Sequence, residues 1–387
     1  MRKYIFILLG ILTTLGAFGQ TWEDSLRIRI DSLLQHPMFE TTQVGIEVYD
    51  LTADSAIYKY HERQLLRPAS TMKVLTAVAS LDELGGSYQF KTRLYRRGQF
   101  SGRTFKGNIY CRGGMDPLFN GDDLSALVEA VGRMDIDTLR GNIVADYSMK
   151  DANRLGEGWC WDDDNPVLSP LLVNKKDNFL RRFLSRLREE NIVFVGDTVR
   201  GPVPRDAEVI CTRSHSIDQI LMPMMKKSDN LFAEAMFYQL AAATGSRVAS
   251  AKDGASQVNR VIRKIGLTPD NYRVADGSGL SLYNYVTAEL EVAFLRYAYG
   301  HQDVYNNLLP SMPVAGVDGT LAKRMQKTAA EGNVQAKTGT VTGISSLAGY
   351  CTARNGHRLC FSIINTGLRR ASTGRQFQDR MCELMCD

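Results

Sequence analysis

The stretch Arg67-Pro-Ala-Ser-Thr-Met-Lys73 contains a serine and a lysine three positions apart, Ser70 and Lys73. An apolar run from Met72 to Leu81 has apolar residues on nearly every helical face, and Gly85-Gly86 ends the pattern. Such a run is typical of a helix buried in a core, and residues three positions apart lie on the same face of a helix. The sequence therefore predicts a buried helix that brings the Lys73 amine within reach of the Ser70 hydroxyl.

Two further motifs follow along the chain, Ser228-Asp-Asn230 and Lys337-Thr-Gly339. Each of the three patterns, Ser-x-x-Lys, Ser-x-Asn and Lys-Thr-Gly, occurs only once. Ser-x-x-Lys or Ser-x-Asn alone would be expected by accident in a chain of this length and composition. The ordered trio is instead typical of a serine acyl-transfer site, in which a serine attacks an amide carbonyl and lysines move the proton.

For Lys73 to act as the base, its pKa must be lowered. An unperturbed lysine with a pKa near 10.4 is neutral in only about one molecule in 2500 at pH 7. Burial and a second nearby ammonium, that of Lys337, both lower a lysine pKa. The mechanism therefore requires the two lysines to lie close together. The alternative is that Ser70 only caps a helix and Lys73 is a surface residue.

Ser228 and Asn230 fall between a helix that ends near Met225 and another that starts near Leu231. This loop placement lets both side chains project into a cleft, while Asp229 can cap the second helix.

Lys337 to Gly339 is predicted to lie on a strand whose edge can pair with an extended peptide. Gly339 keeps that approach open because it has no side chain. Thr338 and Thr340 can hold a terminal carboxylate alongside Lys337.

The first residues predict export. Arg2 and Lys3 precede an apolar run from Tyr4 to Leu12, and Ala17-Phe-Gly19 supplies the small residues that a signal peptidase requires. The run is short for a bilayer span. We therefore expect a signal peptide over residues 1–19 and a secreted, periplasmic protein. An uncleaved anchor is the alternative, and peripheral membrane contact stays open.

Composition argues against several other classes. The formal net charge of +5 is too small to indicate a nucleic-acid partner, and no cluster of basic and aromatic residues is present. The seven cysteines have no C-x-x-C spacing, which argues against a zinc site. No cofactor is expected. Cys351 and Cys360 are equidistant from Asn355-Gly356, a dipeptide favoured in two-residue hairpin turns, which makes them a candidate disulfide pair. The alternative is that both are small core residues.

Strand patterns occur near both ends of the chain, at 42–49, 55–60, 334–340, 346–352 and 358–365. They predict an α+β fold with an antiparallel sheet flanked by helices. Residues 20–87 and 212–387 form the expected catalytic domain. Residues 88–211 have short strands, several glycines and one helical stretch near 178–190, and are expected to form one inserted α/β domain.

The context of the motifs resembles the class C low-molecular-mass penicillin-binding proteins, which are D-alanyl-D-alanine carboxypeptidases and endopeptidases of the penicillin-binding-protein-4 type. The similar segments are Arg67–Lys73, Gly107–Tyr110, Gly113–Pro117, Gly141–Asp146, Lys227–Asn230, Asp276–Ser281, Pro313–Leu321 and Lys337–Gly339. The resemblance covers nearly the whole mature chain. It implies a penicillin-recognising transpeptidase fold, peptidoglycan stem peptides as substrates and β-lactam antibiotics as covalent inhibitors.

The resemblance also implies residue roles. Ser70 would be the nucleophile and Lys73 its base, and Ser228 and Lys337 would relay the proton to the leaving D-alanine. The implied peptide-binding residues are Asn230, Thr338, Gly339 and Thr340, with the backbone N–H groups of Ser70 and Thr340 holding the oxyanion.

An acidic residue of the inserted region can meet the amine of the substrate's diamino acid in this family. Asp146 is the candidate for that role, and the alternative is a carboxylate that only caps a turn at a strand end. Because 154 residues separate Lys73 from Ser228, a single inserted domain is expected. The balance between carboxypeptidase and endopeptidase activity stays open.

Two other functions remain as alternatives. A serine β-lactamase would use the same chemistry but needs a second base for rapid deacylation, and no Glu-x-x-x-Asn segment stands out. An inactive cell-wall-binding or sensor module would have no need of paired lysines.

Overall fold

The two ends of the chain meet in one antiparallel sheet, as the strand patterns predict. The computed structural model describes residues 21–246 and 248–387, so the expected signal peptide lies outside the described residues. The strand order is β10-β11-β12-β1-β2, which leaves β10 at one edge. The strands are β1 (Gln43–Asp50), β2 (Ser55–Tyr60), β10 (Gln335–Val341), β11 (Ile344–Thr352) and β12 (Arg358–Thr366).

Helices cover both faces of this sheet, and residues on neighbouring strand positions face opposite layers. Leu347 and Phe361 join a cluster with helices α1 (Trp22–Leu34) and α10 (Ala371–Cys386). Ala348 and Ile364 join the larger cluster on the other side. The helices of that larger cluster are α2 (Met72–Leu84), α5 (Ile217–Lys226), α6 (Asn230–Ala242), α7 (Ala251–Lys264), α8 (Ala288–Gly300) and α9 (Gln302–Ser311).

Helix α2 is the buried helix that the apolar run predicts. Every residue from Met72 to Leu81 is buried, and Gly85 ends the helix with φ of 77°. A left-handed residue after a helix is most readily a glycine. The helix contacts α6, α8 and α9, so it is enclosed on several sides and its amino end is held in place.

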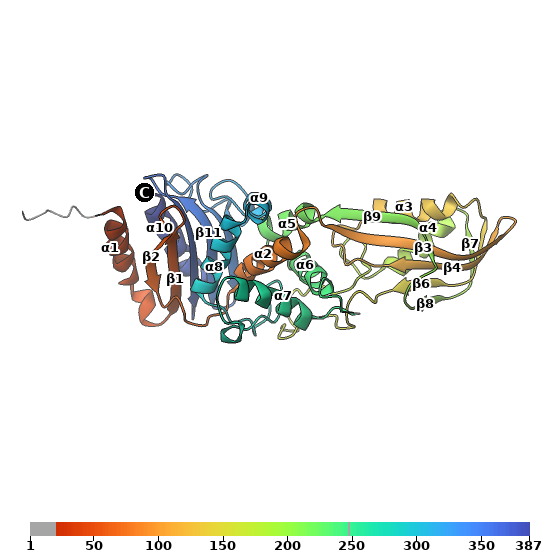
Figure 1. Ribbon diagram of the computed structural model, residues 1–387, viewed down its shortest axis with the longest axis horizontal. Helices are drawn as coiled ribbons and strands as arrows, with labels where there is room; N and C mark the ends of the chain where they lie inside the picture. The colour runs from red at the N-terminus through yellow and green to blue at the C-terminus, as the bar shows by residue number, and fades with distance from the viewer. Residues whose placement is uncertain (1–20, 247) are drawn as a thin grey trace, which may run out of the picture.

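The inserted region forms a second sheet at the other end of an elongated molecule (Figure 1). Strands β3 and β9 pair antiparallel, so the sheet begins and ends beside the catalytic domain. The expected boundary at residue 211 falls within β9. The elements are β3 (Gln89–Ser101), β4 (Thr104–Arg112), α3 (Gly121–Gly132), β5 (Thr138–Arg140), β6 (Ile143–Asp146), α4 (Phe179–Glu189), β7 (Val193–Val195), β8 (Thr198–Arg200) and β9 (Glu208–Ser216).

Helix α3 was not expected, although its sequence carries the signals. Asn120 and Asp123 form a capping box at its amino end. Leu124, Leu127 and Val131 follow at helical spacing and are buried. The expectation of one helical stretch in this region was therefore wrong, because the region contains two helices, α3 and α4.

The expected pairing of Cys351 with Cys360 is also wrong. Cys351 lies opposite Leu359, and Cys360 lies opposite Tyr350. The Ala353 N–H donates to the carbonyl oxygen of His357, so the hairpin loop has three residues rather than two. This one-residue shift places the two cysteines in different core layers, and all seven cysteines are free.

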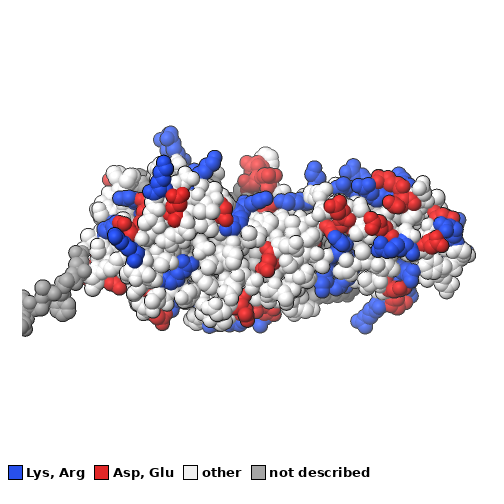
Figure 2. Space-filling view, turned by 90° about the horizontal axis from the view of Figure 1, so that it is seen from above, with Lys and Arg blue, Asp and Glu red and all other residues white. Residues whose placement is uncertain are grey.

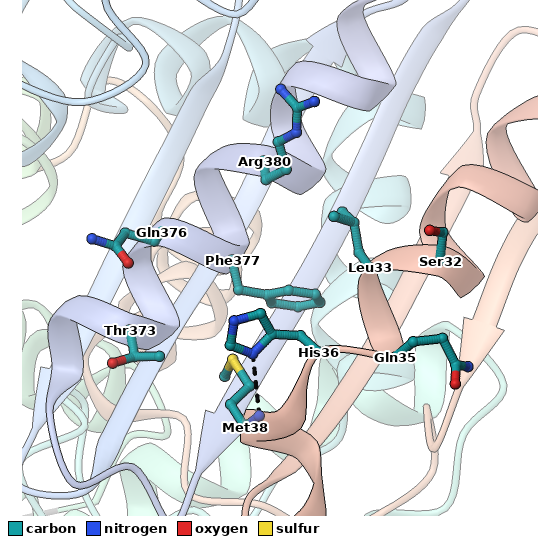
Figure 3. A pocket seen from close by; sticks show the side chains of 9 residues that line it. All are labelled: Ser32, Leu33, Gln35, His36, Met38, Thr373, Gln376, Phe377 and Arg380. Atoms are coloured by element: carbon teal, nitrogen blue, oxygen red, sulfur yellow. Dashed lines mark hydrogen bonds between the residues drawn. The ribbon is translucent and has the colours of Figure 1, made fainter.

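The surface shows two further features. Basic and acidic side chains are interspersed along the face seen in Figure 2. A pocket between α1 and α10 contains none of the three motifs (Figure 3). Its lining residues are Ser32, Leu33, Gln35, His36, Met38, Thr373, Gln376, Phe377 and Arg380. Among the described residues, no helix is both long and apolar enough to cross a membrane.

The hairpin register makes a testable prediction about the cysteines. When the protein is alkylated without reduction and digested, mass spectrometry should find no peptide pair that links Cys351 to Cys360, because their side chains point to opposite faces of the sheet. A digest of reduced protein is the control. Recovery of that linked pair from the non-reduced sample would contradict the register.

Candidate active site

The nucleophile lies in a short turn that is fastened to the sheet. Ser70 belongs to a 3-10 turn, η2 (Ala69–Thr71), directly before α2. Thr71 Oγ1 donates to the carbonyl oxygen of Pro68 over 2.8 Å and lies 3.2 Å from Ser346 Oγ on β11. Ser346 Oγ donates to the same Pro68 oxygen. The turn therefore has a fixed position relative to β11, which pairs with the edge strand β10.

Lys73 reaches the nucleophile, as the three-residue spacing predicts. Its Nζ atom lies 2.9 Å from Ser70 Oγ, 2.8 Å from Asn230 Oδ1 and 2.7 Å from the carbonyl oxygen of Ser278. The side chain is completely buried, with 0% exposed. Three acceptors around one amine hold it in a single direction, with Ser70 as the only hydroxyl among them.

The second lysine makes a parallel arrangement with the second serine. Lys337 Nζ lies 2.8 Å from Ser228 Oγ and 2.6 Å from the carbonyl oxygen of Thr338. Lys337 is also completely buried. Ser228 has φ of 58°, which is uncommon for a serine. The loop before α6 therefore adopts a strained conformation at the residue that meets Lys337.

Burial lowers the pKa of both lysines. Desolvation lowers the pKa of Lys73 to about 8, although the nearby carboxylates of Asp276 and Glu234 act in the opposite direction. Desolvation lowers the pKa of Lys337 well below its ordinary value, and the charge of Lys73 lowers it further. Because each ammonium disfavours the other, the pair holds two protons less readily than separate lysines would. A neutral amine is thus available near neutral pH.

The amide of Asn230 connects the second motif to the first. Asn230 is the first residue of α6, and Asp229 caps that helix by accepting from the N–H groups of Leu231 and Phe232. Lys175, from the inserted region, forms an ion pair with the other oxygen of Asp229. The cap therefore sets the direction of Asn230 toward Lys73, and the inserted domain contacts the same loop.

A buried acidic pair supports the loop that binds Lys73. Glu234 Oε1 accepts from the N–H groups of Gly277 and Ser278, and Asp276 Oδ1 accepts from the Gly279 N–H. Burial, followed by the charge of Asp276, raises the pKa of Glu234 to about 8. Glu234 was not among the predicted residues, although it lies one helical turn after Asn230 and that spacing could have identified it.

Gly339 is required where β10 passes the nucleophile. A Cβ atom at this position would lie 2.0 Å from Ser346 Oγ, 2.7 Å from the Pro68 carbonyl oxygen and 3.0 Å from Ser70 N. Any larger residue would therefore separate the strand from the turn of Ser70. The same closeness brings the backbone of β10 to the Ser70 N–H, the arrangement that an oxyanion hole needs.

The two serines open into one cleft of about 420 Å³ beside the edge strand. Thr338 and Thr340 line it, and Thr338 Oγ1 lies 2.7 Å from Thr320 Oγ1 of the turn η4 (Gly319–Leu321). The residues that line the cleft are Ser70, Ser228, Thr320, Arg324, Thr338, Thr340 and Arg375. The two arginines were missed, because nothing in the linear sequence places them near the motifs.

Asp146 is not among the residues that line this cleft. Its side chain is 2% exposed at the end of β6, and its carboxylate oxygens accept from the N–H groups of Ser148 and Val203. Arg112 lies 3.9 Å from it. These contacts fit the alternative of a turn-capping carboxylate rather than the substrate-amine role. Among the described residues, no cluster of His, Cys, Asp and Glu could hold a metal ion.

The sequence matches the D-Ala-D-Ala carboxypeptidase 3 (S13) family over residues 26–171 and 171–386. It is 28% identical to a D-alanyl-D-alanine carboxypeptidase of Actinomadura sp., covering 93% of this chain and 84% of that protein. It is 26% identical to the D-alanyl-D-alanine carboxypeptidase DacB of Haemophilus influenzae, covering 91% of this chain and 92% of that protein.

The fold is similar to the crystal structure of penicillin binding protein 4 from Haemophilus influenzae. The TM-score is 0.84 at 23% sequence identity, over 92% of this chain and 97% of that one. A structure of that Haemophilus influenzae protein complexed with a β-lactam has a TM-score of 0.77 to this chain. Since the family match covers almost all of the described chain, and the two lysines and two serines converge as its chemistry requires, the protein belongs to the D-Ala-D-Ala carboxypeptidase (S13) family and is a serine-type peptidase.

Proposed function

We propose that the cleft cleaves the terminal D-Ala-D-Ala bond of peptidoglycan stem peptides through an acyl-enzyme on Ser70. The observation that carries this proposal is the pair of buried lysines, each hydrogen-bonded to a different serine hydroxyl beside one cleft. A general base and a separate proton relay are the two functions that serine acyl transfer requires.

In the acylation step, each of the two lysines and two serines has one role. Neutral Lys73 accepts the Ser70 hydroxyl proton while Oγ forms a bond to the peptide carbonyl carbon. The bond from that carbon to the D-alanine nitrogen then breaks, and the proton reaches the leaving nitrogen through Lys337 and Ser228. Water later hydrolyses the ester and regenerates Ser70. The Ser70 N–H and the backbone of β10 at Thr340 stabilise the negative oxygen in both steps.

Peptide binding falls to the edge strand and to Asn230. Strand β10 is at the edge of the sheet, so an extended stem peptide can add to it as a further strand. Gly339 permits this close approach, and Thr338 and Thr340 hold the substrate end. Cross-linked peptides would use the same acyl-enzyme with a different leaving amine, which would make the protein an endopeptidase as well.

We propose that β-lactams acylate Ser70 and that the resulting ester is hydrolysed slowly. Within the described structure, the residues that line the cleft include neither Asp nor Glu, so no carboxylate is ready to activate a water against the ester. This supports the peptidase over a β-lactamase, since the latter needs a second base. The basic residues and apolar run before Leu12 support export to the periplasm, where stem peptides occur.

Labelling with a fluorescent penicillin tests the nucleophile. Wild-type protein should give a covalent adduct that lasts minutes or longer, and Ser70→Ala should give none. Lys73→Ala should slow labelling by roughly 10²- to 10⁴-fold, the usual contribution of a general base. Ser87→Ala, which changes an exposed serine outside the cleft, is the matched control. An adduct that survives in Ser70→Ala would remove Ser70 as the nucleophile.

The pH dependence of acylation tests the role of Lys73. Because burial lowers its pKa to about 8, the neutral fraction should rise from about 1% at pH 6 to about half at pH 8. The second-order acylation rate should therefore increase by about 50-fold over this range. Stopped-flow measurement with a penicillin gives the profile. Lys73→Arg, which stays protonated, should be slow throughout. A flat wild-type profile would contradict the assignment.

A further inference from the structure

The substrate proposed above carries a negative charge that the known motifs do not balance. A peptide ending in D-alanine has a free carboxylate next to the scissile amide. Lys337 is completely buried, and its ammonium already donates to Ser228 and to the Thr338 carbonyl oxygen. Thr338 and Thr340 offer hydroxyl groups but no charge. A carboxylate desolvated in this cleft therefore needs another cation.

Two arginines line the cleft, but one of them is already neutralised. Arg324 Nη2 lies 2.6 Å from Asp379 Oδ1, and its guanidinium also donates to Gln378 and to the backbone oxygen of Arg375. Its side chain is largely buried. These contacts tie Arg324 to helix α10 and leave little of its charge for a ligand.

Arg375 is placed differently. It lies in the second turn of α10 and lines the same cleft as Ser70, Thr338 and Thr340. Among the described residues, no carboxylate oxygen lies within 4.0 Å of its guanidinium, and it influences Asp379 only at longer range. Gly374, directly before it, packs against Ser345 of β11 so closely that a Cβ atom would lie 2.9 Å from Ser345 Cβ. This contact holds the start of α10 against the sheet.

We propose that Arg375 binds the substrate carboxylate next to the leaving nitrogen and makes the enzyme specific for substrates with a free carboxylate there. The planar guanidinium can bind both carboxylate oxygens at once, with the hydroxyl groups of Thr338 and Thr340 completing the site. This role of Arg375 rests on the proposed peptidase function, and it assigns recognition of the substrate's carboxylate end to the Arg375 guanidinium. Arg375 is a specificity residue, and the proton transfers remain with the lysines and serines.

The test compares acids with their neutral counterparts. Acylation of Ser70 is measured with benzylpenicillin and with its carboxylate methyl ester, and turnover with an acyl-D-Ala-D-Ala peptide and its C-terminal amide. Wild type should prefer each acid. Arg375→Ala should reduce the rate with the acids by about 10- to 100-fold, the range for a hydrogen-bonded charge, and leave the ester and the amide nearly unchanged. Arg375→Lys should retain part of the preference.

Arg370→Ala is the matched control, since Arg370 is exposed directly before the same helix and lines a different pocket. The Arg370→Ala protein should prefer acids to the same extent as wild type. If Arg375→Ala keeps the wild-type preference, or loses acid and ester equally, the role of Arg375 is overturned while the peptidase function stands. If wild type forms no Ser70 adduct with either penicillin, the proposed function itself fails.

Discussion

The site depends on keeping two lysine amines out of water beside one cleft. Burying one lysine is costly, and burying two close together is more so, because each disfavours the charge of the other. The structure offsets this cost with hydrogen bonds: Lys73 meets three oxygen acceptors and Lys337 meets two. The part of the desolvation cost that these hydrogen bonds do not offset lowers the pKa of both lysines. A lysine with a lowered pKa can act as a base near neutral pH.

The rest of the fold can be understood as the support for this pocket. Helix α2 is buried along most of its length, which holds Lys73 away from solvent. The absence of a side chain at Gly339 lets β10 lie against the turn of Ser70. Below the pocket, Glu234 and Asp276 organise the loop whose Ser278 carbonyl oxygen accepts from Lys73. Helix packing, strand position and a buried acidic pair thus together fix the positions of the Lys73 amine and the Ser70 hydroxyl.

Sequence alone predicted the parts of the fold and the site that depend on local patterns. The apolar run predicted α2, the alternating strands predicted the five-stranded sheet, and the spacing of Ser70 and Lys73 matches their contact. Prediction from the sequence failed where a contact depends on how distant segments pack together. The disulfide prediction failed because a hairpin loop with one more residue reverses the faces of a strand. Arg375 lies 305 positions after Ser70, and only the packing of α10 on the sheet brings it to the cleft.

Burial, and not hydrogen bonding alone, makes Lys73 a base. The most direct measurement is an NMR titration of lysine side chains in protein labelled with ¹³C and ¹⁵N at lysine, with the Lys73 signal assigned by its loss in Lys73→Arg. We expect a titration midpoint near 8 for Lys73. A midpoint close to 10.4, the value of a lysine in water, would contradict it.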